Sequence, residues 1–322
     1  MPSSATERRS ILVKAFLAWK ALILSLVLVT SFVPSYDTST SLALNLPADH
    51  TPNSPLPSSL GDALASRLTR WDAIYFTSIA HRGYLFEQEW AFGPGLPYLV
   101  SKVVLPLTDI LGFRLPRTVK TASLVSIAVA NASHLGAVLL LHALTLRLFP
   151  RRKNLALVTG LLHVISPAGV FLSAPYSESL FACLSFAGYL LYVAPDLIPA
   201  PASWQRGLSL VVSGALFGYA TACRTNGLLN GVVFAVELLS SLHAILTQQG
   251  GSLVSRLWGA LPNLIATIVG GILVAMGSVI PQGIAYMRYC SGASDPRPWC
   301  SRLPPSIFSF VQEHYWYGTP PP

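Results

Sequence analysis

Long apolar runs recur along this chain and restrict its fold more than any other feature. The first, Ile11–Val33, has about the length of 20 residues that a helix needs to cross a bilayer. Further runs follow, several of them short or interrupted by Gly and Pro: Thr121–Leu148, Leu155–Leu172, Leu180–Ala194, Gly207–Ala222, Leu228–Leu246 and Leu261–Ala285. The sequence therefore predicts an all-α, polytopic membrane protein with about seven transmembrane helices.

The charge of the chain fits a membrane protein and argues against a soluble nucleic-acid-binding protein. Charged residues make up 11% of the sequence, whereas about 25% is usual for a soluble domain. Much of the formal net charge of +8 sits in short basic clusters, such as Arg8 with Arg9 and residues 151–153. A nucleic-acid-binding protein would carry a basic face on a soluble module, and basic flanks of membrane spans explain the clusters better. We expect a membrane as a partner and no nucleic acid.

The first apolar run has two interpretations. Basic residues precede it, as in a secretory signal. However, the run is long for a signal core, and Val33, Pro34 and Ser35 form a poor cleavage site. We therefore expect an uncleaved first transmembrane helix over residues 11–33, with a cytosolic N-terminus over residues 1–10.

The positions of Lys and Arg indicate how the chain is threaded. If residues 34–120 form one lumenal loop, the basic residues 151–153 and Arg256 become cytosolic, as the preference for positive cytosolic loops requires. Three cations then become lumenal: Arg114, Arg117 and Lys120. We favour this topology, in which residues 121–285 form the transmembrane bundle and residues 286–322 a lumenal C-terminal segment.

The segment Tyr98–Leu111 decides between this topology and its alternative. It is apolar but short, and Lys102, Pro106 and Asp109 interrupt it. Such a length favours a re-entrant or interfacial helix within the lumenal loop. If the segment crossed the membrane instead, the basic residues 151–153 would lie in the lumen.

The favoured topology brings polar, irregular segments to one face of the membrane. They are residues 70–72, 91–95, 173–179, 223–227 and 286–316. Polar residues gathered at helix ends on one face indicate a binding or catalytic site. Most other charged residues fall at the ends of the runs, which argues against a transporter, since transporters place ionisable groups near the membrane centre.

Asp72 is the candidate catalytic residue. The spacing predicts one helix over Gly61–Ala80, with Asp72 inside it. A loop carboxylate commonly pairs with a neighbouring cation, here Arg70, or caps a local helix. It can also serve as a general base that takes a proton from an acceptor hydroxyl. Transfer from a polyprenyl-phosphate sugar with a single inversion needs one base rather than the carboxylate pair of glycoside hydrolases.

Other residues are candidates for substrate contacts. Arg82, His81 and Arg224 are candidates for a lipid phosphate, because the guanidinium fork matches phosphate oxygens; an interfacial arginine could equally snorkel. Glu178 follows Tyr176 and is also suited to a helix N-terminus. Glu87 and Glu89 are expected to be solvated, and Glu89, beside Trp90, could also contact a sugar. His314, Tyr315 and Trp316 could stack on a sugar or belong to an interfacial aromatic belt.

The cysteines offer no metal site. Cys183 and Cys223 lie in or beside apolar runs and are expected to behave as small hydrophobic residues. Cys290 and Cys300 could form a disulfide if the C-terminal segment faces an oxidising lumen, or could stay reduced. No spacing resembles that of zinc ligands.

Several blocks of sequence, taken in order, resemble a known family. They are Arg70–Phe76, His81–Glu87 and Ala91–Pro97, then residues 166–181, 224–227 and 299–316. Together they are similar to the GPI mannosyltransferase 2 (PIG-V) family over nearly the whole chain. This chain has Gly93 where the family has Phe. The family also continues past residues 314–316 with more lumenal sequence and another span, so we expect a chain truncated at its C-terminus.

The resemblance implies a GT-C-type glycosyltransferase of the endoplasmic reticulum membrane. Such an enzyme adds the second, α-1,6-linked mannose from dolichyl-phosphate-mannose to a GPI-anchor precursor, with no cofactor. A small membrane subunit is a candidate partner, and a metal requirement is left open. Alternatives are another dolichyl-phosphate-sugar-dependent transferase or an inactive truncated membrane protein.

The resemblance also implies roles for individual residues. Asp72 matches the acidic residue taken as the base. Further residues are expected to bind substrate, either by shaping the donor pocket or by lining the same face: Arg70, Trp71, Arg82, Phe92, Pro94, Gly95, Tyr176, Glu178, Arg224, Asn226, His314, Tyr315 and Trp316.

Overall fold

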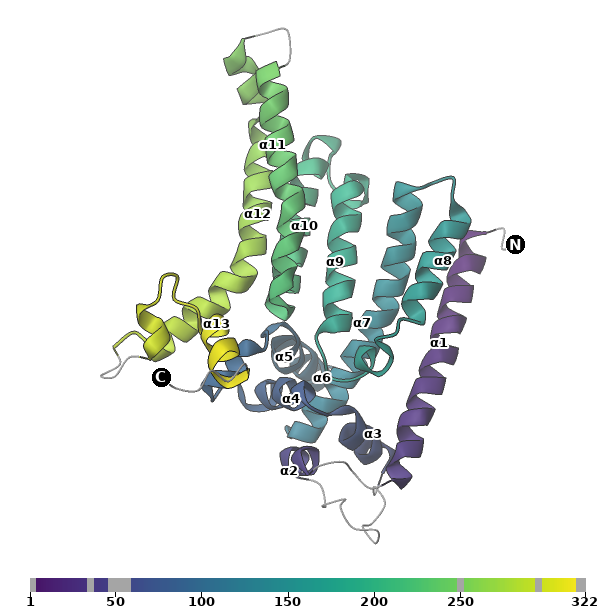
Figure 1. Cartoon of the computed structure of the whole chain (residues 1–322). Helices are drawn as coiled ribbons and strands as arrows, with labels where there is room; N and C mark the ends of the chain where they lie inside the picture. The colour runs from purple at the N-terminus through teal and green to yellow at the C-terminus, as the bar shows by residue number, and fades with distance from the viewer. Residues whose placement is uncertain (1–3, 34–37, 46–58, 248–251, 293–296, 317–322) are drawn as a thin grey trace.

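The protein is an upright bundle of helices with a cap of short helices at one end. This computed structural model describes residues 4–33, 38–45, 59–247, 252–292 and 297–316. Within these ranges every regular element is helical and there is no strand, which confirms the all-α prediction. The bundle, shown in Figure 1, comprises α1 (Ala5–Val29), α7 (Val119–Leu148), α8 (Lys153–Val164), α9 (Glu178–Val193), α10 (Ala202–Cys223), α11 (Val232–Thr247) and α12 (Leu253–Tyr289).

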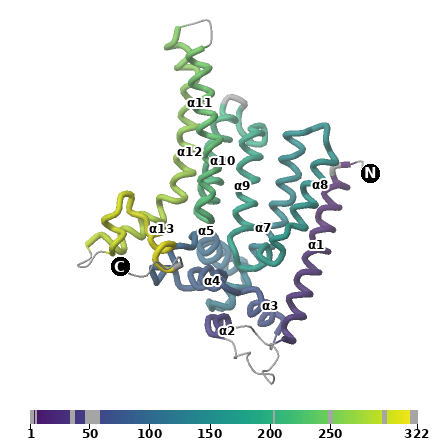
Figure 2. The backbone as a smooth tube through the Cα atoms, in the orientation of Figure 1, coloured from purple at the N-terminus to yellow at the C-terminus, as the bar shows by residue number. Residues whose placement is uncertain are grey.

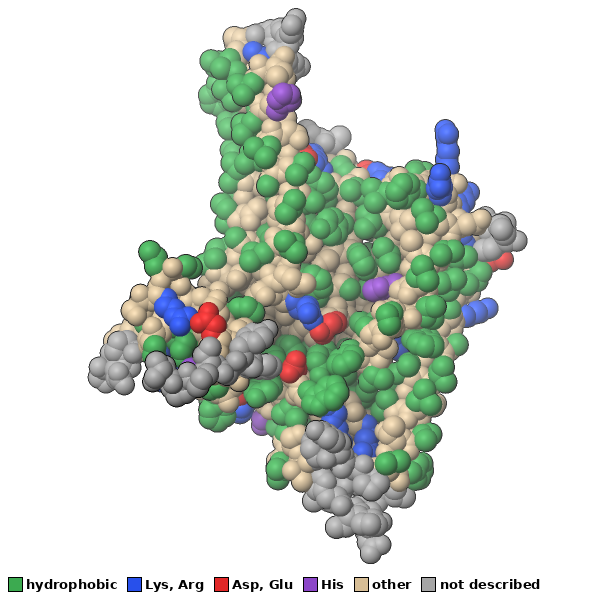
Figure 3. All heavy atoms as spheres, in the orientation of Figure 1, with side chains coloured by type: hydrophobic (Ala, Val, Ile, Leu, Met, Phe, Trp, Pro, Cys, Tyr) green, Lys and Arg blue, Asp and Glu red, His purple; other side chains and the backbone are tan. Residues whose placement is uncertain are grey.

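The bundle has the surface of a membrane protein. Four helical segments among the described residues are long and apolar enough to cross a bilayer: Thr6–Phe32, Val119–Leu148, Thr225–Thr247 and Leu253–Tyr289. Figure 3 shows hydrophobic side chains over the upright helices, with acidic and basic side chains mainly toward the two ends. The chain is thus a polytopic membrane protein, and the number of seven spans stays a prediction.

The cap is built mainly from the segment between α1 and α7. Figures 1 and 2 place its short helices together at the lower end of the bundle, where α1, α10 and α12 end and α7, α9 and α11 begin. They are α2 (Ser39–Leu44), α3 (Leu60–Leu68), α4 (Asp72–Arg82), η2 (Glu87–Ala91), α5 (Gly95–Tyr98), η3 (Leu99–Val104) and α6 (Leu105–Ile110). The last three form one continuous helical run over the segment predicted to be re-entrant or interfacial.

The predicted helix Gly61–Ala80 is in fact two helices, α3 and α4. The break falls at Trp71, whose φ of 51° and ψ of −122° lie outside the helical region. Long-range hydrogen bonds hold the break: Thr40 Oγ1 donates to the Thr69 carbonyl at 2.7 Å, and Tyr176 Oη donates to the Arg70 carbonyl at 3.0 Å. Tertiary contacts thus override the local helical pattern and make Asp72 the first residue of α4.

The apolar run Leu155–Leu172 also differs from its prediction. Helix α8 ends at Val164, and a separate 3₁₀ turn, η4 (Gly169–Leu172), follows. Ser166 precedes Pro167, a position at which the helical conformation is disfavoured, and Gly169 has a φ of 44°. The chain therefore leaves the bundle early and forms a loop that carries Tyr176 to the cap.

Lys20 is an exception to the expectation that charges lie at helix ends. It lies inside α1 and is only 5% exposed. Its ammonium donates to the Leu172 carbonyl at 3.1 Å and to Ser173 Oγ at 2.7 Å. Because a buried lysine needs such partners, Lys20 fixes the loop before Tyr176 to the first helix.

The C-terminal segment returns to the cap. It contains η7 (Pro298–Ser301), α13 (Ile307–Val311) and η8 (Gln312–Trp316), and Cys290 is joined to Cys300 by a disulfide. Trp299, Ile307 and Val311 are fully buried or nearly so. Their burial packs α13 against the cap beside the site described next.

Candidate functional site

The candidate site is a polar cavity of about 390 Å³ where the cap meets the bundle, here called the Asp72 cavity. Five parts of the chain line it: the start of α4, the turn after η2, the start of α9, the end of α10 with η6 (Thr225–Gly231), and the C-terminal segment. The lining residues are Asp72, Phe76, Ala91, Phe92, Gly93, Tyr176, Glu178, Cys223, Arg224, Thr225, Asn226, Phe308 and Gln312. Six predicted site residues therefore come together: Asp72, Phe92, Tyr176, Glu178, Arg224 and Asn226.

Asp72 has no stabilising partner among the described residues. Its carboxylate makes no hydrogen bond or ion pair with them, so the expected alternative of a pair with Arg70 is wrong. Burial, and then the negative charge of Glu178, raise the pKa of Asp72 above its usual value. A carboxylate with a raised pKa is a stronger base than one in water, as a general base requires.

The backbone before Asp72 is strained. A positive φ is unfavourable for a bulky residue such as Trp71 and costs on the order of 1–3 kcal/mol. Tyr176 stabilises this conformation through its hydrogen bond to the Arg70 carbonyl. Burial and the nearby charge of Asp72 raise the pKa of Tyr176 to about 12, so it remains a neutral donor. Strain of this kind is common where a side chain must point into a site.

Glu178 and Arg224 supply the remaining charges. The Arg224 guanidinium donates from Nη1 to Glu178 Oε1. The second oxygen, Oε2, is buried and accepts no hydrogen bond within the described residues. An unpaired buried carboxylate oxygen is costly, so a ligand that donates a hydroxyl here would remove the cost. Arg224 presents further N–H groups that suit an anion.

Two glycines bring the cap into close contact with the bundle. A Cβ on Gly93 would lie 2.4 Å from the carbonyl oxygens of Ala222 and Cys223, and one on Gly95 would lie 2.4 Å from Cys223 Sγ. Only glycine fits at such distances. The Phe92–Pro97 turn thus owes its place beside Arg224 to these residues. Gly95 itself packs against the end of α10 and does not line the Asp72 cavity.

An apolar cavity of about 320 Å³ lies beside the Asp72 cavity. Helices α10 and α12 form one side of it, and Tyr84, Trp90, Pro94 and Tyr98 of the cap form the other. A narrow space of about 30 Å³ lies between the two cavities. Pro94 and Gly277 line both this space and the apolar cavity, and Phe92 and Gly93 line both this space and the Asp72 cavity. Pro94, a predicted site residue, therefore belongs to the apolar side.

A third cavity, of about 450 Å³, lies on the opposite side of Tyr176 and is here called the Trp71 cavity. Arg70 and Trp71, both predicted to bind substrate, line it together with Arg67 and Phe171. Tyr176 lines this cavity and the Asp72 cavity alike. The predicted site is therefore divided between two cavities.

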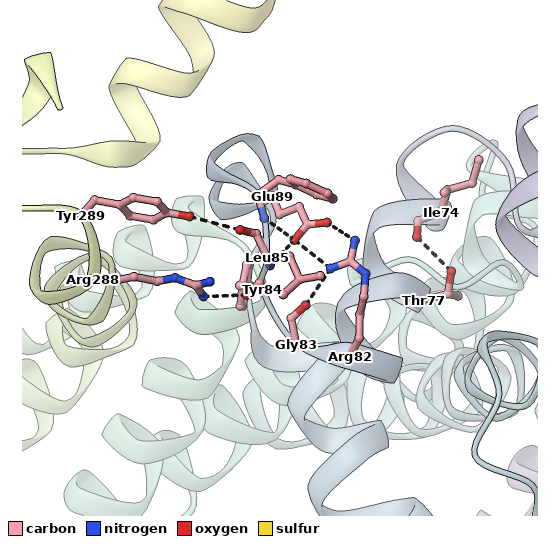
Figure 4. A network of polar contacts seen from close by, with 10 residues as sticks. Ile74, Thr77, Arg82, Gly83, Tyr84, Leu85, Glu89, Arg288 and Tyr289 are labelled. Carbon is pink, nitrogen blue, oxygen red and sulfur yellow. Dashed lines mark hydrogen bonds and ion pairs between the residues drawn. The ribbon is translucent and has the colours of Figure 1, made fainter. Parts of the chain in front are cut away.

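Arg82 does not line any of these cavities, and its phosphate contact stays a prediction. Figure 4 shows its guanidinium directed at Glu89, with distances of 2.5 and 3.2 Å to the two carboxylate oxygens. Glu89 also accepts from the backbone N–H groups of Leu85 and Phe86. It is 1% exposed, against the expectation that it is solvated.

Glu87 is buried too, and it explains the position of the C-terminal aromatic residues. Its carboxylate accepts from Arg297 at 2.6 and 3.0 Å, from Trp299 Nε1 at 2.9 Å and from Tyr315 Oη at 3.3 Å. His314 stacks on Phe310 at 5.1 Å. His314 and Tyr315 thus have structural contacts rather than a place in the Asp72 cavity, and the Trp316 side chain lies outside the described residues.

Burial and the hydrogen-bonding partners shift the pKa values of Glu87 and Glu89 in opposite directions. Burial would raise the pKa of Glu87 and of Glu89. The hydrogen bonds and charges of Arg297 and Arg82, with Trp299, Tyr315 and two backbone groups, outweigh it and lower both pKa values. Figure 4 shows Arg288 and Tyr289 bound to the carbonyls of Tyr84 and Leu85, beside the same turn.

Some lining residues were absent from the prediction. Phe308 and Gln312 line the Asp72 cavity from the C-terminal segment, and Cys223 and Thr225 line it from the end of α10. The last two adjoin Arg224 and could have been found by extending that motif. Phe308 carries no signal in the sequence, because only the tertiary fold brings it there. In the described part of the chain, no group of three or more His, Cys, Asp or Glu residues could hold a metal ion.

Comparison with known proteins now decides the family. The pattern of the family described as mannosyltransferase (PIG-V) matches residues 8–318. The chain belongs to this family. It is 44% identical to "GPI mannosyltransferase 2" of Chaetomium globosum over 95% of this chain and 68% of that protein. No solved structure matches.

Other relatives of this PIG-V family chain have similar names. "GPI mannosyltransferase 2" of Gibberella zeae is 44% identical over 95% of the chain and 66% of that protein. "GPI alpha-1,6-mannosyltransferase 2" of Rattus norvegicus is 33% identical over 80% of the chain and 52% of that protein. The chain thus spans about two thirds of the length of these fungal relatives and about half of the rat protein.

Proposed function

We propose that this chain transfers the second mannose, in α-1,6 linkage, from dolichyl-phosphate-mannose to a GPI-anchor precursor in the endoplasmic reticulum membrane. One observation carries the proposal: an unpaired carboxylate with a raised pKa, that of Asp72, lies in a cavity with an arginine, Arg224. The names and coverage of the relatives support the choice of substrates.

Asp72 acts as the general base in this proposal. It takes the proton of the acceptor hydroxyl while that oxygen bonds to the anomeric carbon of mannose. The bond from this carbon to the phosphate oxygen breaks, and its electron pair leaves with dolichyl phosphate. One inversion at one carbon needs one base, and Asp72 fits this role.

The donor spans the polar and the apolar cavity. Arg224 holds the phosphate, and Asn226 and Glu178 contact the sugar hydroxyls. The apolar cavity between α10, α12 and the cap holds the start of the polyprenyl chain. Because the phosphate is already a good leaving group, the reaction needs no cofactor besides the donor.

The proposed side of the membrane is the lumen. A disulfide such as that between Cys290 and Cys300 persists in oxidising compartments. Cys290 directly follows α12, which ends at the cap end of the bundle in Figure 1. The short basic cluster at residues 151–153 lies at the other end, between α7 and α8, in agreement with a cytosolic location.

Mannose transfer in cells tests the proposal. The chain and its Asp72→Asn variant are expressed in a strain that lacks the second-mannose step, and the accumulated lipid glycans are identified by mass spectrometry. We expect the chain to convert the one-mannose precursor and Asp72→Asn to leave it unconverted. Asp196→Asn is the matched control, at an exposed aspartate of η5 (Pro195–Leu197) between α9 and α10, and should behave like the unmodified chain.

Two results would count against the proposal. Conversion by Asp72→Asn at the normal level would remove Asp72 from the role of base. Accumulation of a different lipid-linked glycan, cleared by the unmodified chain, would indicate another acceptor.

A further inference from the structure

Lys20 is a charged side chain inside the bundle that the proposed reaction does not use directly. It lies in α1, is 5% exposed, and belongs to the first of the four segments able to cross a bilayer. An ionisable residue inside a membrane is costly and commonly has a function. We propose that Lys20 is a positioning residue, which holds the loop of residues 172–179 so that Tyr176 and Glu178 reach the Asp72 cavity. This inference rests on the proposed function, because it names a residue that supports the same site.

The loop of residues 172–179 is buried although it is irregular. It runs from the end of η4 to the start of α9, and Ser173, Ser177 and Ser179 are each at most 1% exposed. Most loops lie at the surface, because the backbone groups of a buried loop have no helical or strand partner and need other donors. The position of this loop therefore depends on the side chains that reach it.

Side chains from three helices donate hydrogen bonds to the start of the loop. Lys20 of α1, which packs beside α8 in Figure 1, donates to the Leu172 carbonyl at 3.1 Å and to Ser173 Oγ at 2.7 Å. Asn131 of α7 donates to the Ser173 carbonyl at 3.3 Å, and the Ser179 hydroxyl of α9 donates to the Leu172 carbonyl at 3.0 Å. Lys20 is the charged donor of the three, and a charge-assisted hydrogen bond is roughly twice as strong as a neutral one. Its loss should therefore affect the loop most.

The other end of the loop carries two residues of the candidate site. Tyr176 and Glu178 both line the Asp72 cavity. The Tyr176 hydroxyl donates to the Arg70 carbonyl at 3.0 Å and so stabilises the backbone conformation before Asp72. Tyr176 lies only three positions after Ser173. A shift at the end that Lys20 holds would therefore move Tyr176, and with it the backbone that orients the proposed base.

The chemistry of the lysine side chain suits this role. An ammonium carries three N–H donors, and that of Lys20 uses two of them on the loop. It also lies 5.5 Å from the centre of the Phe16 ring, a cation–π contact within α1. Methionine has a similar length and no donor. Lys20→Met therefore removes the hydrogen bonds to the loop while it still fills most of the space.

Transfer kinetics in a double-variant cycle test the role. The unmodified chain, Lys20→Met, Tyr176→Phe and the double variant are compared in lipid nanodiscs. We expect Lys20→Met to lower kcat about tenfold or more, because a small misplacement of a catalytic group costs this much, and to change KM for the donor less. Because Lys20 acts through Tyr176, the double variant should be no slower than the slower single variant. Lys14→Met, at an exposed lysine of the same helix, is the control and should behave like the unmodified chain.

Amide hydrogen exchange gives a readout that does not need the reaction. Without substrates, the peptide that covers residues 170–179 should exchange faster in Lys20→Met than in the unmodified chain, while α11 exchanges at the same rate in both. Ser173→Ala removes one acceptor of Lys20 with little change in volume, and should produce the same changes in exchange and in kcat to a smaller extent. If Lys20→Met does not fold, Ser173→Ala carries the comparison and the cycle with Tyr176→Phe.

The outcomes separate this inference from the proposed function. Normal kcat in Lys20→Met, losses that multiply in the double variant, or exchange that rises equally throughout the bundle would each overturn the positioning role and leave the proposed function intact. If the unmodified chain transfers no mannose and exchange rises only in the loop of Lys20→Met, the hold of Lys20 on the loop stands and the proposed function fails.

Discussion

Two regions of the cap hold acidic side chains in opposite ways. In the turn of η2, Glu87 and Glu89 are almost fully buried, and each accepts hydrogen bonds from an arginine and from further donors. In the Asp72 cavity, Asp72 and one oxygen of Glu178 have no hydrogen-bond donor among the described residues. The first pair has lowered pKa values, whereas the pKa of Asp72 is raised.

The difference separates the structural carboxylates of η2 from Asp72, the proposed catalytic one. A satisfied carboxylate in η2 fixes the cap to the C-terminal segment and contributes to stability at neutral pH. An unsatisfied one in a cavity costs stability and keeps its basicity for a reaction. Residue type and charge alone do not distinguish the two, because both regions combine acidic residues with arginine and aromatic side chains.

The largest expected effect on stability comes from the η2 turn, where the buried carboxylates have hydrogen-bond partners. Glu89→Gln removes the charge that Arg82 and two backbone N–H groups stabilise, and we expect a loss of about 1.5–3 kcal/mol in unfolding free energy. The transfer rate per folded molecule should change little. Thermal unfolding in detergent measures the loss, and Glu313→Gln, in an exposed pair with Arg302, is the control.

The ion pair of Glu89 in the η2 turn should also make stability depend on pH. The folded-state pKa of Glu89 is lower than its unfolded value, so its stabilisation is present above about pH 4.5 and is lost as pH falls through the folded pKa. Glu89→Gln should remove this part of the acid dependence. An identical pH dependence in both proteins would show that the ion pair contributes nothing to stability.

Tyr176→Phe tests whether the position of Asp72 depends on the strained backbone conformation at Trp71. The variant loses the hydrogen bond to the Arg70 carbonyl, worth about 1 kcal/mol, and should release the strained conformation at Trp71. We expect kcat to fall roughly tenfold as Asp72 loses its orientation. Tyr192→Phe, which removes a hydrogen bond to Glu237 in the bundle, is the matched control. If Tyr176→Phe and Tyr192→Phe lose the same stability and neither changes kcat, Tyr176 has only a structural role.

The smallest effect concerns the charge of Glu178. Burial is the larger cause of the raised Asp72 pKa and Glu178 is the second, so Glu178→Gln should lower that pKa only in part. Because a general base must be deprotonated, the acid limb of the kcat/KM profile should move to lower pH. Movement to higher pH would contradict the electrostatic account of Asp72.

The sequence was enough for the helical class and for six of the thirteen residues that line the Asp72 cavity. Apolar length predicts the bundle, and the motifs around Asp72, Glu178 and Arg224 share one cavity as expected. The break at Trp71 was not predictable, because it depends on Tyr176, which lies 106 positions beyond its hydrogen-bond partner Arg70. Nor was the burial of Glu87, whose partner Arg297 lies 210 positions away. A local pattern carries no information on such distant partners.

We infer that Asp72 lacks hydrogen-bond partners because it is used as the base. Its folded-state pKa is raised, so its ionisation costs stability at neutral pH, and Asp72→Asn removes that cost. The decisive measurement is the melting temperature and the single-turnover transfer rate of Asp72→Asn in one preparation. We expect an equal or higher melting temperature with a transfer rate lower by on the order of 10²–10⁴-fold. A lower melting temperature with normal transfer would contradict it.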